Sequence, residues 1–253
     1  MATSLRIKPK QMLGKYRIES KLGDGGFATV YRAFDTLEGI RIALKVPYPH
    51  LVSPEWTEDF RREIRINAQL RHPHVLPVKN AEMVEGGLVV AYPLGDRTLQ
   101  DRLRSRMSLP TAIEYVQQLL SAVAYAHSKR VMHCDIKPEN LILFDDHLML
   151  SDFGLAKISA RTLRASGSGT VGYIAPEQAM GRPSFRSDVF SLGLVSYRMV
   201  AGILPEWPYD WPFPSHSRLC QRAHPDLVRL LKRSLENDPV SYTHLRAHET
   251  LTD

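Results

Sequence analysis

Cysteine is scarce in this chain. Only Cys134 and Cys220 occur among its 253 residues, too few for the disulfide framework that holds many small secreted domains together. Nothing in the sequence therefore points to an oxidising compartment, and we expect a cytoplasmic protein.

Long apolar runs and blocks of like charge are also missing. No stretch reaches the roughly 20 apolar residues that a membrane-spanning helix needs, and residues 1–10 lack the apolar segment of a signal peptide. The net charge is +6, but Lys and Arg are spread from Arg6 to Arg233. We interpret this excess as a solvated basic surface, and expect neither a membrane segment in this chain nor a nucleic-acid partner.

The first third of the chain reads as strands interrupted by one helix. Runs rich in β-branched and aromatic residues alternate with glycine-rich or acidic turns, which predicts an antiparallel meander. The predicted strands are Tyr16–Leu22, Ala28–Phe34, Ile40–Val46, Val75–Glu82 and Leu88–Tyr92. Ser53, followed by Pro54, is typical of a helix start, and Phe60, Ile64 and Leu70 then recur at helical spacing.

The remainder of the chain reads as mainly helical. Ser108 is a suitable cap for a helix whose apolar stripe includes Ile113, Val116 and Leu120. Residues 189–200 are apolar nearly all round, which predicts a helix buried at the centre of its lobe. The change in periodicity thus predicts an α+β protein of two lobes. Residues 93–96 would form the hinge between them, and a cleft between two lobes is where ligands usually bind.

A glycine-rich segment, Gly-Asp-Gly-Gly-Phe-Ala-Thr-Val at residues 23–30, lies between two predicted strands. Glycines allow the backbone to approach a polyphosphate closely, although a hairpin turn without a ligand has the same composition. In the third strand, alternation places Ala43 and Lys45 on one face, where Lys45 could hold phosphate. Its cation needs a partner, and Glu63 edges the buried face of the 53–70 helix, where an unpaired carboxylate is costly.

The most informative segment is Val-Met-His-Cys-Asp-Ile-Lys-Pro-Glu-Asn at residues 131–140. Two short apolar runs follow, and they predict a tight hairpin that brings Asn140 beside Ser151 and Asp152. An amide oxygen and a carboxylate suit magnesium, a cation that takes further ligands from water and phosphates. Asp135 is then placed as a base near the metal, and Lys137 can neutralise charge on a moving phosphoryl group.

Together these motifs resemble the protein kinase family over about residues 14–239. The resemblance implies a bilobal fold with a small antiparallel sheet and one helix in the N-lobe and a larger, mainly helical C-lobe. Its predicted parts are an extension at 1–13, an N-lobe at 14–92, a hinge at 93–96 and a C-lobe at 97–239.

The same resemblance implies roles for individual residues. Lys45 would pair with Glu63 and hold the α- and β-phosphates of ATP, and Asp135 would accept the substrate proton. Asn140 and Asp152 would bind Mg²⁺, with Mn²⁺ as a possible substitute. Lys137 and Thr170 complete the expected catalytic set. The expected nucleotide contacts are Gly23, Asp24, Gly25, Gly26, Phe27, Val30, Ala43, Lys45, Ala91, Pro93 and Ile142.

The pattern with Lys137 after Asp135, and with Thr170 ahead of Ala-Pro-Glu at 175–177, resembles serine/threonine kinases rather than tyrosine kinases. The glycine-rich segment resembles that of bacterial members of the family. The implied function is transfer of the ATP γ-phosphoryl group to Ser or Thr of protein substrates, including autophosphorylation. Two alternatives remain, a pseudokinase acting as a nucleotide-binding or scaffolding module and a small-molecule kinase. The sequence does not indicate an oligomeric state.

The chain departs from the family pattern at several positions. Ala28 replaces the third glycine of the loop, and Cys134 stands where many members have an Arg that reads activation-segment phosphate. Asn67 replaces an aliphatic residue on the regulatory helix. Pro93 is the third hinge residue, which normally donates its N–H to adenine; proline has no N–H, so either that bond is lost or the hinge register is shifted.

Residues 240–250, Val-Ser-Tyr-Thr-His-Leu-Arg-Ala-His-Glu-Thr, resemble a translated sequencing-library adapter. We therefore expect residues 240–253 to be non-native and the kinase domain to be truncated after Pro239. The family places an Arg where this chain has Tyr242, and that Arg pairs with the residue matching Glu177. Glu177 is accordingly expected to lack an Arg partner from the tail.

Overall fold

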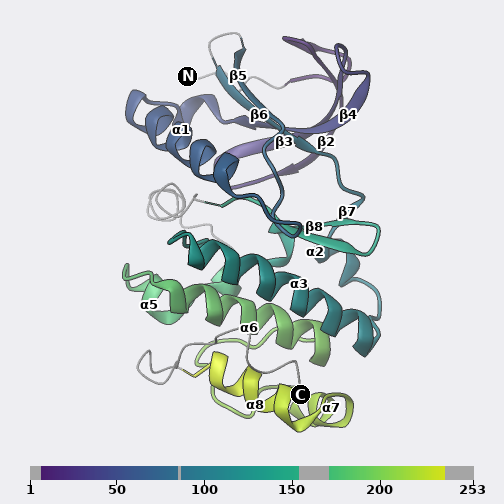
Figure 1. The fold of residues 1–253 in the computed structure, drawn as a ribbon, viewed down its shortest axis with the longest axis vertical. Coiled ribbons are helices and arrows are strands. Elements are labelled where there is room, and N and C mark those ends of the chain that lie inside the picture. Colours follow the sequence, from purple (N-terminus) through teal and green to yellow (C-terminus); the bar gives the residue numbers. More distant parts are fainter. Residues whose placement is uncertain (1–6, 85–86, 154–170, 237–253) are drawn as a thin grey trace. The chain divides into compact units, whose positions relative to one another are not determined.

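The computed structural model describes residues 7–84, 87–153 and 171–236, and these divide into two compact units. Unit 1 contains the described residues up to Gly95 except His72–Val75. Unit 2 contains His72–Val75 and the described residues from Asp96 onward. The division between Gly95 and Asp96 lies within the stretch predicted as a hinge. Each unit is described separately below (Figure 1).

Unit 1 is built on a six-stranded sheet with the order β1-β2-β3-β4-β6-β5, in which all neighbouring strands are antiparallel. Its strands are β1 (Met12–Leu13), β2 (Tyr16–Asp24), β3 (Ala28–Asp35), β4 (Ile40–Pro47), β5 (Asn80–Val84) and β6 (Gly87–Pro93). The predicted meander is confirmed for β2, β3 and β4, whereas the next strand beside β4 is β6 rather than β5. The prediction of a strand from Val75 was wrong, because β5 begins only at Asn80 and Pro77, which has no N–H to donate, interrupts the run.

Alternate residues of these strands form the core of unit 1. Tyr16 and Ile18 on β2 pack with Ala33 on β3 and with Ile42 and Leu44 on β4. Side chains two positions apart point to the same face of a strand, which is why the period-two pattern of the sequence places these residues together.

The helix of unit 1 is α1 (Pro54–Gln69), and it begins where the sequence predicts. The Ser53 hydroxyl accepts the N–H of Trp56 at 3.1 Å, so it caps the first turn. The buried residues of α1 are Trp56, Phe60, Glu63 and Asn67. We expected Ile64 to define the buried face, but Ile64 is only half-buried. Glu63 therefore lies within that face rather than at its edge, since the spacing from Phe60 through Glu63 to Asn67 follows the helical period.

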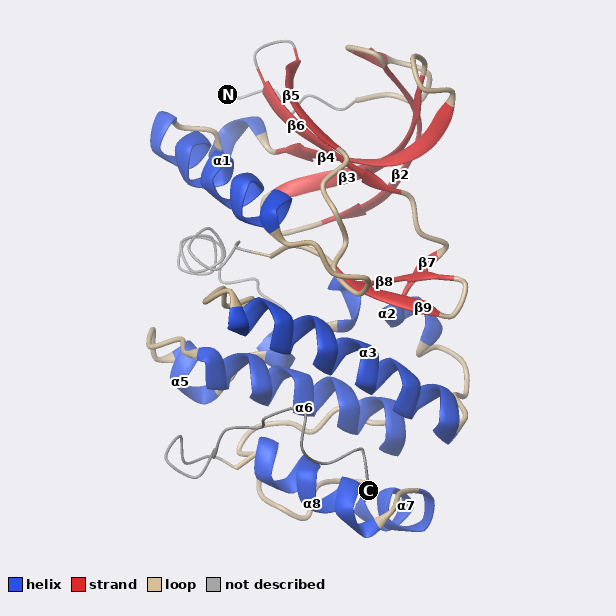
Figure 2. Ribbon diagram, viewed as in Figure 1, coloured by secondary structure: helices blue, strands red, loops and turns tan. Residues whose placement is uncertain are grey.

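Unit 2 contains a small sheet and most of the helices (Figure 2). The sheet has the order β7-β8-β9, formed by β7 (Arg97–Thr98), β8 (Leu141–Phe144) and β9 (His147–Leu150). The helices are α2 (Leu99–Arg102), α3 (Leu109–Ser128), α5 (Pro176–Ala179), α6 (Phe185–Ala201), α7 (His216–Arg222) and α8 (Pro225–Ser234). Short 3₁₀ turns occur at Pro49–Leu51 in unit 1 and at Pro138–Asn140 and Val171–Tyr173 in unit 2.

Helix α6 is the central helix of unit 2, as its apolar composition predicts. It lies alongside α3 (Figure 2) and contacts α7 and α8. A Cβ atom at Gly193 would lie 2.4 Å from the Ser234 hydroxyl oxygen at the end of α8, so glycine is required for this close approach. Ser108 caps α3 by accepting the N–H of Thr111 at 3.2 Å. The prediction of both helices is confirmed.

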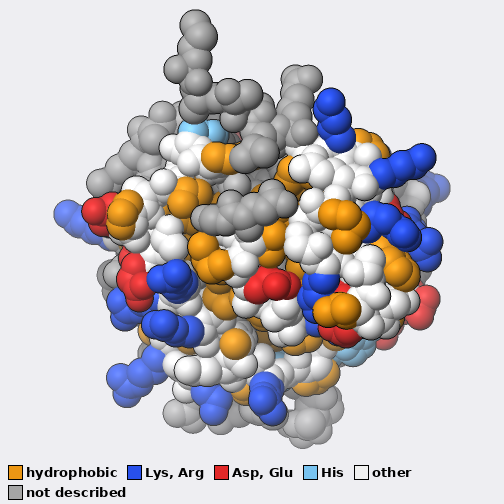
Figure 3. Space-filling model, turned by 90° about the horizontal axis from the view of Figure 1, so that it is seen from above, with side chains coloured by type: hydrophobic (Ala, Val, Ile, Leu, Met, Phe, Trp, Pro, Cys, Tyr) orange, Lys and Arg blue, Asp and Glu red, His pale blue; other side chains and the backbone are white. Residues whose placement is uncertain are grey.

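Within the part of the chain that the structure describes, no helix has the length and apolar character to span a bilayer. On the face shown in Figure 3, Lys and Arg side chains are spread around the edge with apolar side chains between them. This distribution agrees with the scattered basic residues of the sequence.

Candidate active site

The β8–β9 hairpin positions the predicted metal ligands of unit 2. Leu141 pairs with Leu150 at its open end. The backbone N–H and the hydroxyl of Ser151 both donate to the Asn140 carbonyl oxygen at 2.9 Å. The predicted hairpin is therefore confirmed, and it holds Asn140 against the residue that precedes Asp152.

Asp135 is the centre of a polar network in unit 2. Lys137 Nζ lies 2.9 Å from Asp135 Oδ1, and Asn140 Nδ2 donates to Asp135 Oδ2 at 2.9 Å and to the Asp135 backbone oxygen at 2.8 Å. Asp135 and Lys137 are partly exposed, whereas Asn140 is buried. The structure thus brings together three of the predicted residues and leaves the carboxylate of Asp135 accessible to a substrate.

His133 connects this loop to the segment that carries Asp152. Its Nε2 lies 2.7 Å from the Ser151 carbonyl oxygen, and its Nδ1 accepts the N–H of Asp135 at 3.1 Å. These partners place the ring hydrogen on Nε2, because a carbonyl only accepts and an N–H only donates. The Phe153 ring meets the His133 ring edge-on with centroids 4.7 Å apart. Both side chains are therefore packing members of the site.

Asp188, on the first turn of α6, is a buried acid that holds the backbone of the loop preceding Asp135. It is 1% exposed and accepts the backbone N–H groups of His133 at 2.8 Å and of Cys134 at 2.7 Å. The ring of His127 also lies 2.8 Å from this carboxylate. The loop preceding Asp135 is thereby attached to the central helix.

Cys134 is a buried, structural cysteine. Its φ angle is +60°, a left-handed conformation that is uncommon for a residue with a side chain. Burial raises the pKa of its thiol to about 12, and the nearby carboxylates of Asp188 and Asp135 act in the same direction. The thiol is therefore protonated at neutral pH and is no substitute for the cation that the family pattern has here.

The glycine-rich segment of unit 1 forms the turn between β2 and β3. The N–H of Gly25 donates to the Ala28 carbonyl oxygen at 2.7 Å, and the Tyr48 hydroxyl donates to the Gly25 carbonyl oxygen at 3.0 Å. Thr29 Oγ1 donates to Asp24 at 2.9 Å, and the Lys21 ammonium beside Asp24 lowers the pKa of that carboxyl. Gly23, Gly25 and Gly26 are exposed, as a phosphate-binding turn requires.

Phe27, at the tip of this turn, points into unit 1. Its ring is buried and packs on the rings of Trp56 and Phe60 of α1, with centroids 6.3 and 6.1 Å away. Lys45 Nζ lies 4.5 Å from the centroid of the same ring. Lys45 and Glu63 are each 5% exposed. Burial of an ammonium and a carboxylate within one unit is costly unless each is paired. The burial of both side chains is therefore consistent with the expected pairing of Lys45 with Glu63.

The remaining nucleotide-site candidates lie at regular strand positions. Strand β6 pairs with β4 in continuous register, with Ala91 opposite Leu44 and Pro93 opposite Ile42. In β3, Val30 pairs with Lys45. Val30 and Ala43 are half-buried, as is Ile142 on β8 of unit 2.

The donor set of Asn140 and Asp152 fits magnesium. Nδ2 of Asn140 is engaged by Asp135, so the amide oxygen is the atom that remains for a cation. Asp152 is half-buried and has a φ of +63°. A hard cation of this kind needs only one or two protein oxygens when phosphates and water supply the rest.

Some predictions fall on residues outside the described part of the chain. Thr170 and the tail at 240–253 are among them. Glu177 itself is described. Its Oε1 accepts the Ser187 hydroxyl at 2.7 Å, and its buried Oε2 has no hydrogen-bond partner among the described residues.

Sequence reasoning missed two residues that support the loop. Gln178 Nε2 donates to the Cys134 carbonyl oxygen at 2.6 Å, and His127 at the end of α3 reaches Asp188. Neither residue belongs to a motif used above. In the sequence, Gln178 is marked only by its position directly after Ala-Pro-Glu. Nothing in the residues around His127 indicates a functional role.

Comparisons with known proteins agree with this geometry. The protein kinase domain family matches residues 16–237. CBL-interacting serine/threonine-protein kinase 18 of Arabidopsis thaliana is 33% identical over 245 residues, which cover 90% of this chain and 47% of that protein. CBL-interacting protein kinase 16 of Oryza sativa subsp. japonica is 36% identical over 252 residues, which cover 92% and 55%.

Among solved structures, the PknI kinase domain of Mycobacterium tuberculosis is similar with a TM-score of 0.71 and 26% identity, over 94% of this chain and 93% of that one. The chain spans about half the length of the curated relatives described above. The family match covers most of the chain and includes the residues of the Asp135 network. This chain belongs to the protein kinase domain family.

Proposed function

We propose that the protein is a serine/threonine protein kinase that uses ATP and Mg²⁺ and transfers the γ-phosphoryl group to hydroxyl groups of proteins, including its own. The observation that carries the proposal is the network around Asp135, in which one carboxylate contacts both Lys137 and Asn140. The two cysteines, one of them buried and protonated, favour a cytoplasmic setting.

Each residue of the network has a distinct part in the proposed reaction. The Asp135 carboxylate receives the hydrogen bond of the substrate hydroxyl and takes its proton as the oxygen attacks phosphorus. The Lys137 ammonium neutralises charge that builds on the transferred group. Asn140 and Asp152 would hold Mg²⁺, which when bound orients the phosphates and neutralises part of their charge.

In unit 1, the exposed glycines of the 23–26 turn offer backbone N–H groups to phosphates, and Lys45 supplies a fixed cation. Ala43, two positions before Lys45 on β4, is small and half-buried, which leaves room for a flat base on the face of the strand that carries Lys45. Support for protein rather than small-molecule substrates comes from family membership and from Ala-Pro-Glu at residues 175–177.

The test is incubation of the purified chain with radiolabelled ATP, magnesium chloride and a generic basic protein, followed by phosphoamino-acid analysis. We expect phosphoserine or phosphothreonine, and no transfer when EDTA removes the metal. Asp135→Asn should lower the rate by about 100-fold or more, the usual contribution of a general base. Asp146→Asn, on the exposed β8–β9 turn, is the matched control and should leave the rate unchanged.

Two results would contradict the proposal. Equal transfer by wild type and Asp135→Asn would show that Asp135 is not the base. Binding of ATP with Mg²⁺ by wild-type protein, without transfer to any substrate, would instead indicate a pseudokinase.

A further inference from the structure

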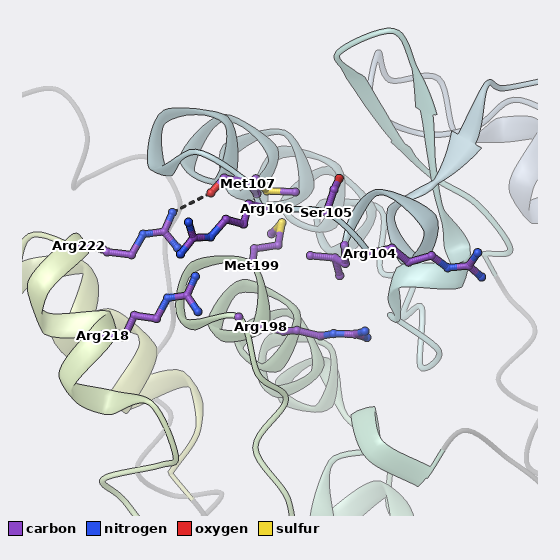
Figure 4. A pocket seen from close by; sticks show the side chains of 10 residues that line it. Arg104, Ser105, Arg106, Met107, Arg198, Met199, Arg218 and Arg222 are labelled. Atoms are coloured by element: carbon purple, nitrogen blue, oxygen red, sulfur yellow. Dashed lines mark hydrogen bonds between the residues drawn. The ribbon is translucent and has the colours of Figure 1, made fainter.

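An arginine-rich pocket lies within unit 2, formed by the turn after α2, the end of α6 and helix α7 (Figure 4). Its volume is about 260 Å³. We name it the arginine pocket. The residues that line it are Leu103, Arg104, Ser105, Arg106, Met107, Arg198, Met199, Gly202, Arg218 and Arg222. Half of these lining residues are arginines and none is acidic, so the pocket carries a strong excess of positive charge.

Three of the arginines converge on one end of the pocket. Arg106 and Arg222 lie beside each other, and Arg218 extends from α7 towards them, whereas Arg104 and Arg198 run to the other side (Figure 4). Arg106 and Arg218 are exposed. Among the described residues, neither of their side chains has a hydrogen-bond or ion-pair partner. Their guanidinium groups therefore remain able to bind an anion.

The other three arginines have hydrogen-bond or ion-pair partners, but only one of the three has a partner with a negative charge among the described residues. Arg222 donates to the carbonyl oxygens of Val200 at 2.6 Å and of Met107 at 2.8 Å. Arg198 donates to Gln100 and to the Tyr173 hydroxyl. Since carbonyl, amide and hydroxyl oxygens carry no formal charge, the positive charge of Arg198 and Arg222 persists. Within the described part of the chain, Arg104 is the one pocket arginine that faces an acid, Asp101 at 3.4 Å.

The pocket is held in shape by its own hydrogen bonds. Arg102 Nη1 donates to the Ser105 hydroxyl and to the Arg106 carbonyl oxygen, both at 3.1 Å, and so fixes the turn that carries Arg106. On the facing side, Gly202 ends α6 with a φ of +84°. A Cβ atom there would lie 3.0 Å from Arg218 Nη1, so the absence of a side chain lets this guanidinium lie over the helix end, where the helix dipole favours a cation.

We propose that the arginine pocket binds the phosphate group of a phosphorylated serine or threonine side chain in a peptide segment. Guanidinium groups present paired N–H donors that match phosphate oxygens, and a doubly charged anion neutralises more of the cluster than a carboxylate does. The buried Met107 and Met199 supply an apolar floor for the methylene or methyl carbons of the modified residue.

The size of the pocket favours a small group over a larger ligand. Sites for nucleotides and other small molecules of that size are typically about 300–1,000 Å³, and this pocket is smaller. A single side chain with its phosphate is a better match. The choice of a phosphoprotein as the source rests on family membership, because protein kinases form phosphorylated serine and threonine. The binding test below needs no turnover, so it can fail or succeed independently of the proposed activity.

The experiment is fluorescence anisotropy with a labelled peptide in which one phosphoserine is flanked by alanine and glycine. Unphosphorylated and glutamate-substituted versions are the comparison peptides, and excess ADP with Mg²⁺ occupies the nucleotide site. We expect the wild-type chain to bind the phosphopeptide at least tenfold more tightly than either comparison peptide. Inorganic phosphate should compete only at concentrations well above the Kd of the phosphopeptide.

Exposed arginines are the best residues to change, since their replacement is least harmful to folding. Arg106→Ala and Arg218→Ala should each weaken phosphopeptide binding about tenfold or more, the usual effect of losing a charge-assisted hydrogen bond. Arg218→Lys, which keeps the charge but loses the paired donors, should give an intermediate loss. Lys232→Ala on α8 removes the same charge from an exposed position outside the pocket and should change binding less than twofold.

Circular dichroism of each variant verifies that the fold is retained. The proposal is overturned if Arg106→Ala and Arg218→Ala bind as wild type does, or no more weakly than Lys232→Ala. It is equally overturned if the glutamate peptide binds as tightly as the phosphopeptide, which would mark the pocket as a site for acidic peptides. The proposal is also contradicted if inorganic phosphate displaces the labelled peptide at concentrations near the Kd of the phosphopeptide, because the peptide would then contribute nothing to the affinity.

Discussion

The carboxylate of Asp188 accepts the backbone N–H of Cys134 at 2.7 Å, and Cys134 has a left-handed φ of +60°. Fifty-four positions separate these residues in the chain. A conformation of this kind costs energy for a residue with a Cβ and persists only where surrounding contacts impose it. Asp188 on α6 supplies such a contact immediately before Asp135, the proposed base.

Replacement of Asp188 by Asn should therefore destabilise the protein and slow phosphoryl transfer. Asn has one acceptor oxygen, so its NH₂ group would face a buried backbone N–H of His133 or Cys134. We expect a loss of about 1–3 kcal/mol in the free energy of unfolding and a fall in kcat with little change in the KM for ATP. Chemical denaturation and steady-state kinetics measure both, with Asp146→Asn as the control. Unchanged stability would show that the carboxylate does not hold the loop.

Pro93→Val should strengthen ATP binding. Pro93 is paired with Ile42 at the end of β6 in regular register, and valine at this position would supply the N–H that proline lacks. One added hydrogen bond contributes about 0.5–1.5 kcal/mol, so the Kd for ATP should fall by roughly two- to tenfold. Isothermal titration calorimetry measures this directly, and Pro47→Val, at the end of neighbouring β4, is the control. An unchanged or weaker affinity would mean that residue 93 does not face adenine.

Asp35 should make an acid-sensitive contribution to the stability of unit 1. This carboxylate is buried, which by itself raises its pKa, but Lys15 at 2.8 Å and the N–H groups of Glu38 and Leu37 outweigh burial and lower the pKa. A lowered native pKa means that the contribution is complete above the unfolded pKa of about 3.9 and is lost as pH falls through the native value.

The matching variant is Asp35→Asn. At pH 7 it should be less stable than wild type by roughly 1–3 kcal/mol. The difference should shrink as the pH falls below about 4, because the carboxyl of the unfolded chain takes up a proton there while the folded carboxyl does so only at lower pH. Thermal unfolding across this range provides the measurement, and Asp210→Asn, an exposed acid, serves as the control. A difference that stays constant down to the most acidic pH would be inconsistent with a titrating Asp35.

Asn67→Leu should stabilise the protein. The side chain of Asn67 is 3% exposed, and its Oδ1 is buried without a hydrogen-bond partner among the described residues. Leucine of similar size removes that acceptor and adds apolar contact, so we expect a gain of about 1–3 kcal/mol in the free energy of unfolding. Gln69→Leu, two positions along α1 and exposed, should have little effect. A loss of stability in Asn67→Leu would show that the amide has a partner in the native protein.

Local features of this protein followed from its sequence. The strands of the meander, the caps at Ser53 and Ser108 and the β8–β9 hairpin were all predicted, because each depends on residues only a few positions apart. The hairpin also placed Asn140 beside Ser151 correctly, since a tight turn between two short strands allows one arrangement of its open end.

Features that depend on distant residues required the tertiary structure. Helical spacing alone suggested Ile64 for the buried face of α1. Packing of Trp56 and Phe60 against Phe27 selected the face with Glu63 instead. The conformation of Cys134 depends on Asp188, and no local pattern encodes that pair. The net charge of +6 suggested only a scattered basic surface. The arginine pocket exists because folding brings the turn after α2, the end of α6 and α7 together, so charges roughly 100 residues apart in the chain share one site.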